Sequence, residues 1–249
     1  MQTVIDTELI QYTLQPPSPA AFANKPGASL SWMLRVRSSP NPKRLLVLIH
    51  GFTGDENSMW VFARDLPSHY WMIAPRAPYV TETTGYSWRP LPSSDFGMPS
   101  LEQLRPSAEA LIRLIDAYQS SAGIEASDFD VMGFSQGAVM CNTLAFLYPQ
   151  RIRKVGILAG FVPLSAQREN EESGIVPDGL EELVSQRPLE GKSLFVTHGT
   201  KDETVTIDRA RASIALLEQA GAQVTYCEDE VGHKVSVKCL TALKKFFAD

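Results

Sequence analysis

Ser135 lies at the centre of the segment Gly133-Phe-Ser-Gln-Gly137, which follows an apolar run and precedes a helical pattern. A serine in such a segment is carried on a sharp strand-to-helix turn, because the flanking glycines let strand and helix approach closely. Its hydroxyl then projects above the end of a sheet, where a substrate can reach it. We therefore predict that Ser135 is a catalytic nucleophile. The alternative for the same residues is an ordinary turn lined by glycines.

A serine hydroxyl is a weak nucleophile and needs a general base, and the chain has four histidines. His233 follows an apolar strand and lies in a glycine-containing loop before the last helical pattern, at the sheet edge predicted for Ser135. It is the predicted base, and the alternative is a histidine that only caps the helix. His50 and His198 each end an apolar strand before a glycine and are expected to be structural, and His69 is expected at the surface.

The histidine in turn needs an acid to orient it, and the expected order along the chain is serine, acid, histidine. Asp202 follows another apolar strand, so it lies at the carboxyl end of that strand and is the predicted acid. Asp208 is the second choice, because it falls within a helical pattern. Glu228 and Asp229 are too close to His233 along the chain to orient it from a neighbouring strand.

Acyl transfer also requires N–H groups that stabilise an oxyanion. Gln136 follows the nucleophile at a predicted helix N-terminus, so its backbone N–H is the first expected donor. The second should come from His50-Gly-Phe-Thr-Gly-Asp55, where two glycines permit a tight reversal of the chain. Phe52 is the expected contributor, through its backbone. The alternative is that this segment only connects a strand to a helix.

These residues need a scaffold in which strands and helices alternate. Continuous apolar runs, typical of strands buried on both faces of a parallel sheet, occur at 45–49, 71–74, 129–132, 155–159, 194–197 and 224–227. Helical stripes separate them, at 59–66, 111–118, 138–148, 207–217 and 237–247, and Pro106 is expected to mark a helix boundary. Two alternating segments, 10–14 and 30–36, predict an antiparallel strand pair before the sheet. The prediction is one α/β domain over 1–249.

Composition and charge exclude several classes of protein. The chain has 249 residues, of which 44% are hydrophobic and 20% charged, as in an ordinary globular protein. The net charge of −5 repels phosphate backbones, so no nucleic-acid partner is expected. The longest apolar stretch, 155–164, is too short to cross a bilayer, and no basic segment of a signal peptide opens the chain, so stable membrane insertion is not expected.

The cysteines and the absence of other motifs bound the chemistry further. Cys141, Cys227 and Cys239 are few, odd in number and far apart, which predicts reduced thiols in a cytoplasmic protein rather than disulfides or a metal site. The sequence has none of the zinc-protease, phosphate-loop or dinucleotide-binding motifs. We expect no cofactor and no metal.

An ordered set of segments resembles the α/β-hydrolase fold and, within it, the phospholipase/carboxylesterase family that includes acyl-protein thioesterases. The matching segments are His50-Gly51 with Gly54-Asp55, Pro75-Arg-Ala-Pro78 with Ser87-Trp88, and the segments 133–137, 156–163, 198–202 and 232–233. This resemblance implies a mostly parallel sheet with helices on both faces, a triad of Ser135, Asp202 and His233, and oxyanion donors Phe52 and Gln136.

In two places the sequence departs from the pattern of this family. Ser87-Trp88 is followed by Arg89-Pro90, where the family usually has Phe-Asp, in a loop that should line the acyl pocket. The segment 10–36 adds an antiparallel pair that the smaller members abbreviate.

The resulting hypothesis is a serine hydrolase that cleaves carboxylic esters or thioesters of short-to-medium acyl chains through an acyl-enzyme. Its substrate would be a small-molecule or lipid-like ester, and its activity should rise between about pH 6 and 7 as histidine loses its proton. Lysophospholipase, acyl-protein thioesterase and dienelactone-type activities stay open, although the last usually uses cysteine. The alternative is a ligand-binding protein on a hydrolase fold, without turnover or with a single turnover. A homo-oligomer is also left open.

The substrate pocket is the least determined part of the site. The candidates for its lining are Thr53, Trp88, Phe161 and Val162, together with Trp60, Tyr79 and Phe96. The aromatic residues among them could equally belong to the core. Two stretches, 81–100 and 163–178, fit no regular element, and loops this long are usually functional walls or lids, or simply disordered.

Overall fold

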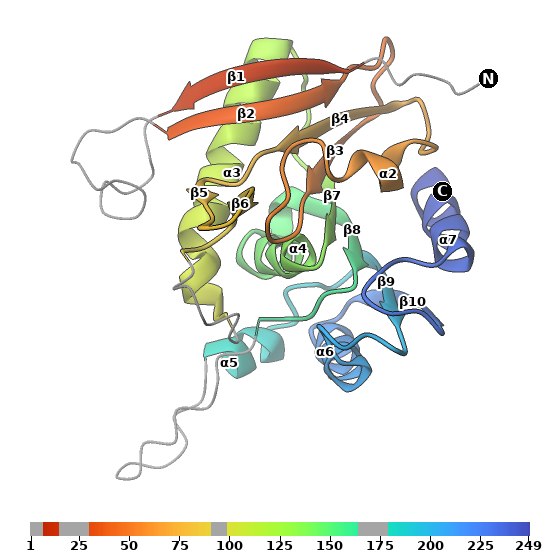
Figure 1. The fold of residues 1–249 in the computed structure, drawn as a ribbon. Coiled ribbons are helices and arrows are strands. Elements are labelled where there is room, and N and C mark those ends of the chain that lie inside the picture. Colours follow the sequence, from red (N-terminus) through yellow and green to blue (C-terminus); the bar gives the residue numbers. More distant parts are fainter. Residues whose placement is uncertain (1–6, 15–29, 91–98, 164–178) are drawn as a thin grey trace.

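The computed structural model describes residues 7–14, 30–90, 99–163 and 179–249. Their main feature is an eight-stranded sheet with the strand order β1-β2-β4-β3-β7-β8-β9-β10 (Figure 1). These strands are β1 (Glu8–Leu14), β2 (Leu30–Arg37), β3 (Arg44–Ile49), β4 (Tyr70–Pro75), β7 (Phe129–Phe134), β8 (Ile152–Leu158), β9 (Ser193–Gly199) and β10 (Gln223–Asp229).

The sheet is mostly parallel, with antiparallel strands at its N-terminal side. β4, β3, β7, β8, β9 and β10 pair in parallel with their neighbours. β1 pairs antiparallel with β2, and β2 pairs antiparallel with β4. The predicted sheet architecture is confirmed. In β3 the residues 45–49 are all buried, as a strand covered on both faces requires, whereas β1 alternates between exposed and half-buried residues.

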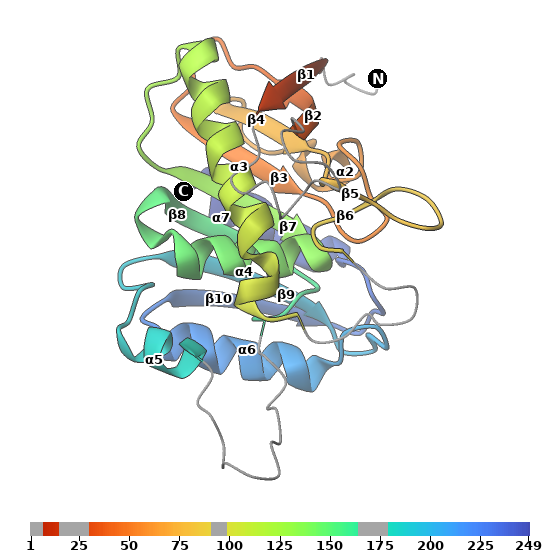
Figure 2. The ribbon, with the colours of Figure 1, turned by 90° about the vertical axis from the view of Figure 1, so that its left-hand side faces the viewer.

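Helices cover both faces of this sheet, as Figure 2 shows in the perpendicular view. They are α2 (Trp60–Ala63), α3 (Leu101–Ala122), α4 (Gln136–Leu147), α5 (Gly179–Ser185), α6 (Ile207–Gln219) and α7 (Val237–Ala248), with a 3-10 turn η1 (Pro149–Arg151). A separate hairpin of β5 (Tyr79–Val80) and β6 (Tyr86–Ser87) lies beside the sheet.

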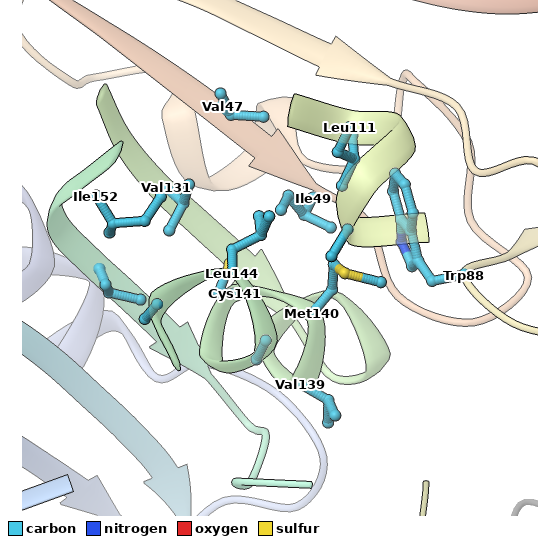
Figure 3. Close-up of a cluster of buried hydrophobic side chains, with 14 of the residues drawn as sticks. Val47, Ile49, Trp88, Leu111, Val131, Val139, Met140, Cys141, Leu144 and Ile152 are labelled. Carbon is cyan, nitrogen blue, oxygen red and sulfur yellow. The ribbon is translucent and has the colours of Figure 1, made fainter. Parts of the chain in front are cut away.

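The core is divided by the sheet into two clusters of buried side chains. The larger cluster contains Leu111 of α3 and Leu144 of α4, packed against Val47 and Val131 of the sheet (Figure 3). The smaller cluster lies on the other face and includes Leu243 of α7. The sheet is therefore covered on both faces, and its carboxyl edge is left to loops that can carry a site.

The prediction that Pro106 marks a helix boundary is wrong, because α3 begins at Leu101 and contains this proline. The helix starts earlier because Ser100 and Gln103 form a capping box: the Ser100 side chain accepts from the Gln103 N–H, and the Gln103 side chain accepts from the Ser100 N–H. Pro106 lies in the second turn and removes one helical hydrogen bond. The burial of the α3 face against the sheet offsets that loss.

The prediction of reduced cysteines is wrong for two of the three. Cys227 in β10 and Cys239 in α7 form a disulfide, with their Cα atoms 5.6 Å apart. They meet because the chain turns back after β10 and places the first turn of α7 beside the end of that strand. Cys141 is a free thiol buried in α4, and burial raises its pKa well above the ordinary value. It is therefore an inert core residue.

Two further searches apply to the described ranges only. No helix within them is both long enough and apolar enough to span a bilayer. The same residues contain no cluster of three or more histidine, cysteine, aspartate or glutamate side chains that could hold a metal ion.

Candidate active site

Ser135 lies between the end of β7 and the start of α4, as the sequence predicts. Its φ of 54° and ψ of −118° are an uncommon conformation for a residue other than glycine. A Cβ on Gly133 would lie 2.2 Å from the Gly137 oxygen, and one on Gly137 would lie 2.0 Å from the Ile49 oxygen. Neither position can carry a side chain. The turn is further fixed by a 2.8 Å hydrogen bond from the Ser135 N–H to the Leu158 oxygen.

His233 and Asp202 complete a hydrogen-bonded chain that begins at this serine. Nε2 of His233 lies 2.9 Å from Ser135 Oγ, and Nδ1 of His233 lies 2.7 Å from Asp202 Oδ2. A carboxylate only accepts, so Nδ1–H must donate to Asp202, and Nε2 is then free to accept the serine proton. Asp202 is itself held by the N–H groups of Thr204 and Val205, each 2.9 Å from Oδ1.

The loop that carries His233 is anchored on both sides. The Lys201 N–H donates to the Val231 oxygen at 3.0 Å and so ties the histidine loop to the loop of Asp202. The Phe134 ring lies 5.0 Å from the His233 ring, which limits the positions open to the imidazole. The Cys227–Cys239 disulfide closes the same loop covalently. The imidazole is therefore positioned by residues at or after the ends of three strands, β7, β9 and β10.

The segment predicted to supply the second oxyanion donor lies directly against the nucleophile turn. A Cβ on Gly51 would lie 3.4 Å from Ser135 Cβ and 3.1 Å from the Phe134 oxygen. The segment reverses through a 3.0 Å hydrogen bond from the Gly54 N–H to the Gly51 oxygen, and Thr53 has a positive φ of 64°. Phe52 is thus held at the same sheet edge as Gln136, whose N–H is one of the first groups of α4 and lacks a partner within the helix.

One short segment, 86–88, bridges these two turns. The Thr53 N–H donates to the Tyr86 oxygen at 3.0 Å, and the Trp88 indole N–H donates to the His50 oxygen at 2.8 Å. On the other side, the Gln136 side-chain oxygen accepts from the Trp88 N–H at 3.0 Å. The segment 86–88 is therefore bonded both to the neighbours of Phe52 and to the Gln136 side chain.

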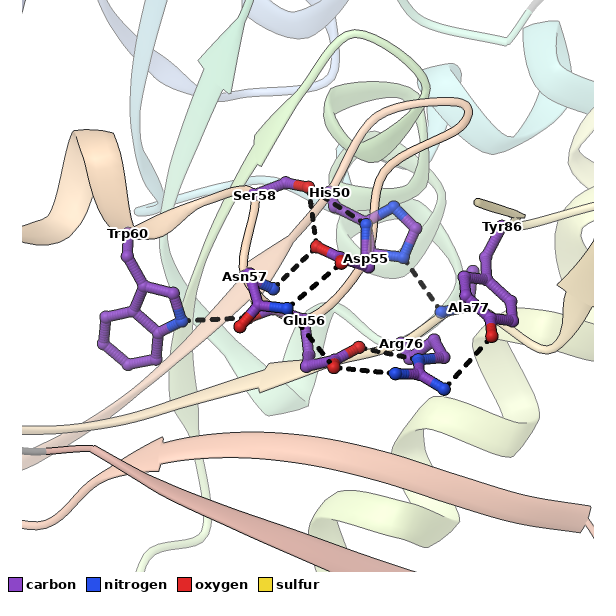
Figure 4. A network of polar contacts seen from close by, with 9 residues as sticks. All are labelled: His50, Asp55, Glu56, Asn57, Ser58, Trp60, Arg76, Ala77 and Tyr86. Carbon is purple, nitrogen blue, oxygen red and sulfur yellow. Dashed lines mark hydrogen bonds and ion pairs between the residues drawn. The ribbon is translucent and has the colours of Figure 1, made fainter. Parts of the chain in front are cut away.

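An ion pair between buried Glu56 and partly exposed Arg76 fixes the far side of the Phe52 loop (Figure 4). Arg76 donates to both carboxylate oxygens of Glu56, at 2.6 and 2.7 Å, and also to the Tyr86 hydroxyl at 3.1 Å. Its guanidinium lies over the Tyr86 ring, 4.6 Å from the centroid. Burial alone would raise the pKa of Glu56, but the hydrogen bonds and charge of Arg76 outweigh it and lower that pKa. The loop is thus anchored by a charged pair, and removal of either side chain would leave the other charge without its partner.

His50 anchors the same loop from below, as a neutral side chain. Its Nδ1–H donates to the Gly51 oxygen at 2.7 Å, and its Nε2 accepts from the Ala77 N–H at 2.9 Å. Burial lowers the pKa of His50 to about 4, and a proton on Nε2 would also face the N–H of Ala77. The structure places His50 in a structural position, in agreement with its expected role.

The other two histidines lie in different surroundings. His198 is buried, its Nε2–H donates to the Val205 oxygen at 2.7 Å, and burial lowers its pKa. This bond holds the loop of Asp202. His69 is half-buried at the amino edge of the sheet, where with Arg44 it lines a cavity of about 520 Å³ far from Ser135.

The candidate pocket residues differ in how far they are exposed. Trp88 and Val162 are fully buried, Phe161 is nearly so, and Thr53 is exposed. Trp88 lies beneath the Phe52 loop and supports it, so its position is that of a core residue. Trp60 and Tyr79 are half-buried, and Phe96 falls outside the described residues.

Sequence reasoning missed the residues that hold the Phe52 loop. Arg76 lies in the segment Pro75-Arg-Ala-Pro78, which enters the sequence argument only through the resemblance, and nothing in the sequence pairs it with Glu56. The only available signal was the presence of two opposite charges beside apolar strands. The side chain of Gln136 was missed in the same way, because only its backbone N–H is implied by its place after the nucleophile.

Comparison with known proteins identifies the family. A family model described as Phospholipase/Carboxylesterase matches residues 34–249. The chain belongs to this family. Among curated relatives of the family, a probable carboxylesterase SOBER1-like of Arabidopsis thaliana is 24% identical over 238 residues, which are 90% of this chain and 85% of that protein. Acyl-protein thioesterase 1 of Debaryomyces hansenii is 26% identical over 207 residues, 76% of this chain and 82% of that protein.

Solved structures of carboxylesterases share the fold. The crystal structure of a carboxylesterase from Mesorhizobium loti matches with a TM-score of 0.69 at 20% identity, over 87% of this chain and 94% of that one. Arabidopsis thaliana SOBER1 matches with a TM-score of 0.64 at 19% identity, over 82% of this chain and 97% of that one. The fold is the α/β-hydrolase fold, and family membership makes the chain a carboxylesterase-type hydrolase, as predicted.

Proposed function

We propose that this hydrolase cleaves carboxylic esters or thioesters of short-to-medium acyl chains, with Ser135 as nucleophile, His233 as base and Asp202 as the orienting acid. One observation carries the proposal. The 2.9 Å contact from His233 Nε2 to Ser135 Oγ and the 2.7 Å contact from His233 Nδ1 to Asp202 Oδ2 form one continuous chain. Three residues far apart in sequence meet in the geometry that a serine hydrolase requires.

The reaction would proceed through an acyl-enzyme. Ser135 Oγ attacks the carbonyl carbon while its proton moves to His233 Nε2, and Asp202 stabilises the resulting imidazolium. The backbone N–H groups of Phe52 and Gln136 stabilise the negative charge on the carbonyl oxygen. His233 then gives its proton to the departing alcohol or thiol. A water molecule, deprotonated by His233, attacks the acyl-enzyme and releases the acid.

The proposed class of substrate follows from the family. A small-molecule or lipid-like ester fits the family, and curated relatives are named both carboxylesterase and acyl-protein thioesterase. A cytoplasmic location was predicted from three reduced cysteines. The disulfide removes that argument, so the compartment is not part of the proposal.

The first experiment is steady-state hydrolysis of p-nitrophenyl esters from acetate to palmitate by the wild type and Ser135→Ala. Loss of the nucleophile should lower kcat by a factor on the order of 10⁶, as when a triad serine is removed elsewhere. The chain length of the best substrate then measures the acyl pocket. A Ser135→Ala variant that retained turnover would exclude this serine from the mechanism.

A second measurement separates the rival functions. Covalent labelling by a fluorophosphonate without turnover of any ester would indicate a reactive serine and an unsuitable set of substrates. A burst of one product molecule per enzyme, followed by no further turnover, would favour a ligand-binding protein that reacts once. If the protein shows no labelling and no turnover, the serine-hydrolase proposal is contradicted.

A further inference from the structure

Arg209, in the first turn of α6, carries a charge that no carboxylate in the described part of the chain contacts. Its Nε and Nη2 atoms are buried and have no hydrogen-bond partner among the residues that the structure describes. Several other arginines of the described chain each contact a carboxylate, among them Arg76, Arg105, Arg151, Arg153, Arg187 and Arg211. Arg35 also has one buried nitrogen without a partner, but Arg209 has two. Buried polar groups are nearly always paired, so two unpaired nitrogens on one cation need an explanation.

The guanidinium of Arg209 is held in place by an aromatic ring. Its Cζ lies 3.3 Å from the centroid of the Phe161 ring, within the range of a cation–π contact. The two segments are also joined through Ser213, which donates to the Arg209 oxygen and accepts from the Val162 N–H, both at 2.9 Å. Phe161 is fixed from the other side, because its oxygen accepts from Asn142 of α4 at 2.9 Å.

This position belongs to the same sheet edge as the nucleophile. A Cβ on Gly160 would lie 3.2 Å from the Ser135 oxygen, so the residue before Phe161 touches the nucleophile turn. Because consecutive Cα atoms are about 3.8 Å apart, the Phe161 backbone lies within about 9 Å of that oxygen. A short loop before α6 connects Asp202 to the helix turn that carries Arg209.

The side chain stays charged at neutral pH although its environment disfavours the charge. Burial lowers the pKa of Arg209 to about 10, which still leaves it protonated at pH 7. A positioned cation with unpaired donors is the arrangement that binds a planar anion, because a guanidinium and a carboxylate can form two parallel hydrogen bonds.

We propose that Arg209 is a specificity residue that binds a carboxylate carried by the substrate, so that this enzyme prefers esters or thioesters with an anionic group near the scissile bond. The proposal rests on the proposed function, because it assumes an ester held at Ser135. The inference specifies the charge of the substrate, a property that neither the triad nor the family determines.

The first arm of the test compares two pairs of esters, and the members of each pair differ in a terminal carboxylate. Mono-p-nitrophenyl adipate and suberate are paired with p-nitrophenyl hexanoate and octanoate. The shorter succinate and glutarate are avoided, because their own carboxylate attacks the ester. The quantity measured is the ratio of kcat/KM for the anionic ester to that for the neutral ester, and intrinsic reactivity cancels when variants are compared by this ratio.

A second arm places the charge on the leaving group. Butyrate esters of 4-hydroxybenzoic acid and of 4-hydroxybenzamide differ in one carboxylate, and the same ratio is measured for each variant. Arg209→Gln should lower the anionic-to-neutral ratio by roughly 10- to 100-fold in one of the two arms, as expected for loss of a charge-assisted hydrogen bond. Arg209→Lys should retain part of the preference.

The matched control is Arg211→Gln, which removes an exposed arginine two positions further along α6 that pairs with Glu228. Its ratios should equal those of the wild type. A second variant guards against loss of folding: if Arg209→Gln does not hydrolyse the neutral esters, the same ratios are measured for Arg209→Met, whose side chain is of similar length but has neither the charge nor the N–H donors.

The outcomes separate this inference from the function on which it rests. If the neutral esters are hydrolysed and Arg209→Gln keeps the wild-type ratio in both arms, the role of Arg209 is excluded while the serine-hydrolase proposal stands. A wild-type ratio in Arg209→Met in both arms excludes it as well. If no ester of any pair is hydrolysed, the proposed function fails and this inference fails with it.

Discussion

Two neighbouring turns at the carboxyl edge of the sheet each hold a non-glycine residue at positive φ, and they are stabilised in different ways. Ser135 has a φ of 54°, and Thr53, beside the proposed oxyanion donor Phe52, has a φ of 64°. The nucleophile turn is enclosed by backbone atoms that lie 2.2 Å from where a Cβ on Gly133 would be and 2.0 Å from where one on Gly137 would be. The Phe52 loop has backbone hydrogen bonds of its own but depends in addition on polar side chains, the Glu56–Arg76 pair and His50.

The difference has a physical consequence for each turn. Backbone packing leaves no space, so even a methyl group must displace β3 or α4. Polar contacts can be removed one at a time, and each contributes on the order of 1–3 kcal/mol. The nucleophile turn should therefore respond to substitutions almost as all or none, whereas the Phe52 loop should respond in steps and to pH.

The largest expected effect is that of Gly137→Ala. The new Cβ would lie 2.0 Å from the Ile49 oxygen, and backbone cannot move aside without separating α4 from β3. We expect a loss of more than about 4 kcal/mol in the free energy of unfolding, measured by urea denaturation.

Gly123→Ala is the control for this substitution. Gly123 ends α3 at a φ of 66°, and no atom lies within 4 Å of where its Cβ would be, so only the left-handed conformation is penalised. The expected cost is about 1 kcal/mol. Equal losses for the two alanine variants would contradict the view that close backbone contact determines the nucleophile turn.

The next effect is a loss of stability in acid that comes from His50. The unfolded histidine takes up a proton near pH 6.5, whereas the folded one does so only near pH 4. The native state therefore loses stability as the pH falls through this window, by about 3 kcal/mol for the shift of His50 alone.

Urea denaturation at pH 7 and pH 4 measures this effect in the wild type and in His50→Gln. The variant should be less stable at pH 7 but should lose about 3 kcal/mol less between the two pH values. His198 and His69, whose pKa values burial also lowers, and carboxylates with lowered pKa values such as Glu56 account for the loss of stability that remains in the variant. The same loss of stability in both proteins would show that His50 does not control it.

A smaller effect is expected from Glu56→Gln, which leaves Arg76 without its charged partner. The Arg76 side chain is partly exposed to solvent. We therefore expect the free energy of unfolding to fall by about 2 kcal/mol rather than by the full cost of breaking a buried pair. The looser Phe52 loop should lower kcat about tenfold and change KM little, since the oxyanion forms only in the transition state.

Glu190→Gln provides the matched control, because Glu190 forms an exposed pair with Arg187. Its effect on stability should be within about 0.5 kcal/mol, with no change in kcat. An unchanged kcat in Glu56→Gln, despite the loss of stability, would separate the ion pair from the position of Phe52.

The smallest expected effect is a gain of stability. Thr53 is β-branched and has a positive φ, and its side chain bonds only to the oxygen of the preceding residue among the described contacts. Thr53→Gly removes the steric penalty and should raise the free energy of unfolding by up to about 1 kcal/mol. Thermal unfolding would detect this as a higher Tm. A lower Tm would mean that the threonine side chain stabilises the loop.

The sequence by itself determined the nucleophile turn, the order of the three proposed catalytic residues and the mostly parallel sheet. Each depends on short-range chemistry: glycines two residues from Ser135, continuous apolar runs for buried strands, and polar residues where those strands end. These features are local, so the neighbours in the chain are enough to specify them. The helix around Pro106 was misjudged because its start depends on a capping box, not on the proline.

Only the tertiary structure decided which distant residues meet. The Cys227–Cys239 disulfide, the Glu56–Arg76 pair and the burial of Trp88 beneath the Phe52 loop each join segments whose spacing in the sequence carries no signal. Arg209 is the clearest case, since its unpaired charge can be recognised only when the positions of the carboxylates are known. Partners of this kind are chosen by the packing of the sheet and helices, so no local pattern in the chain can specify them.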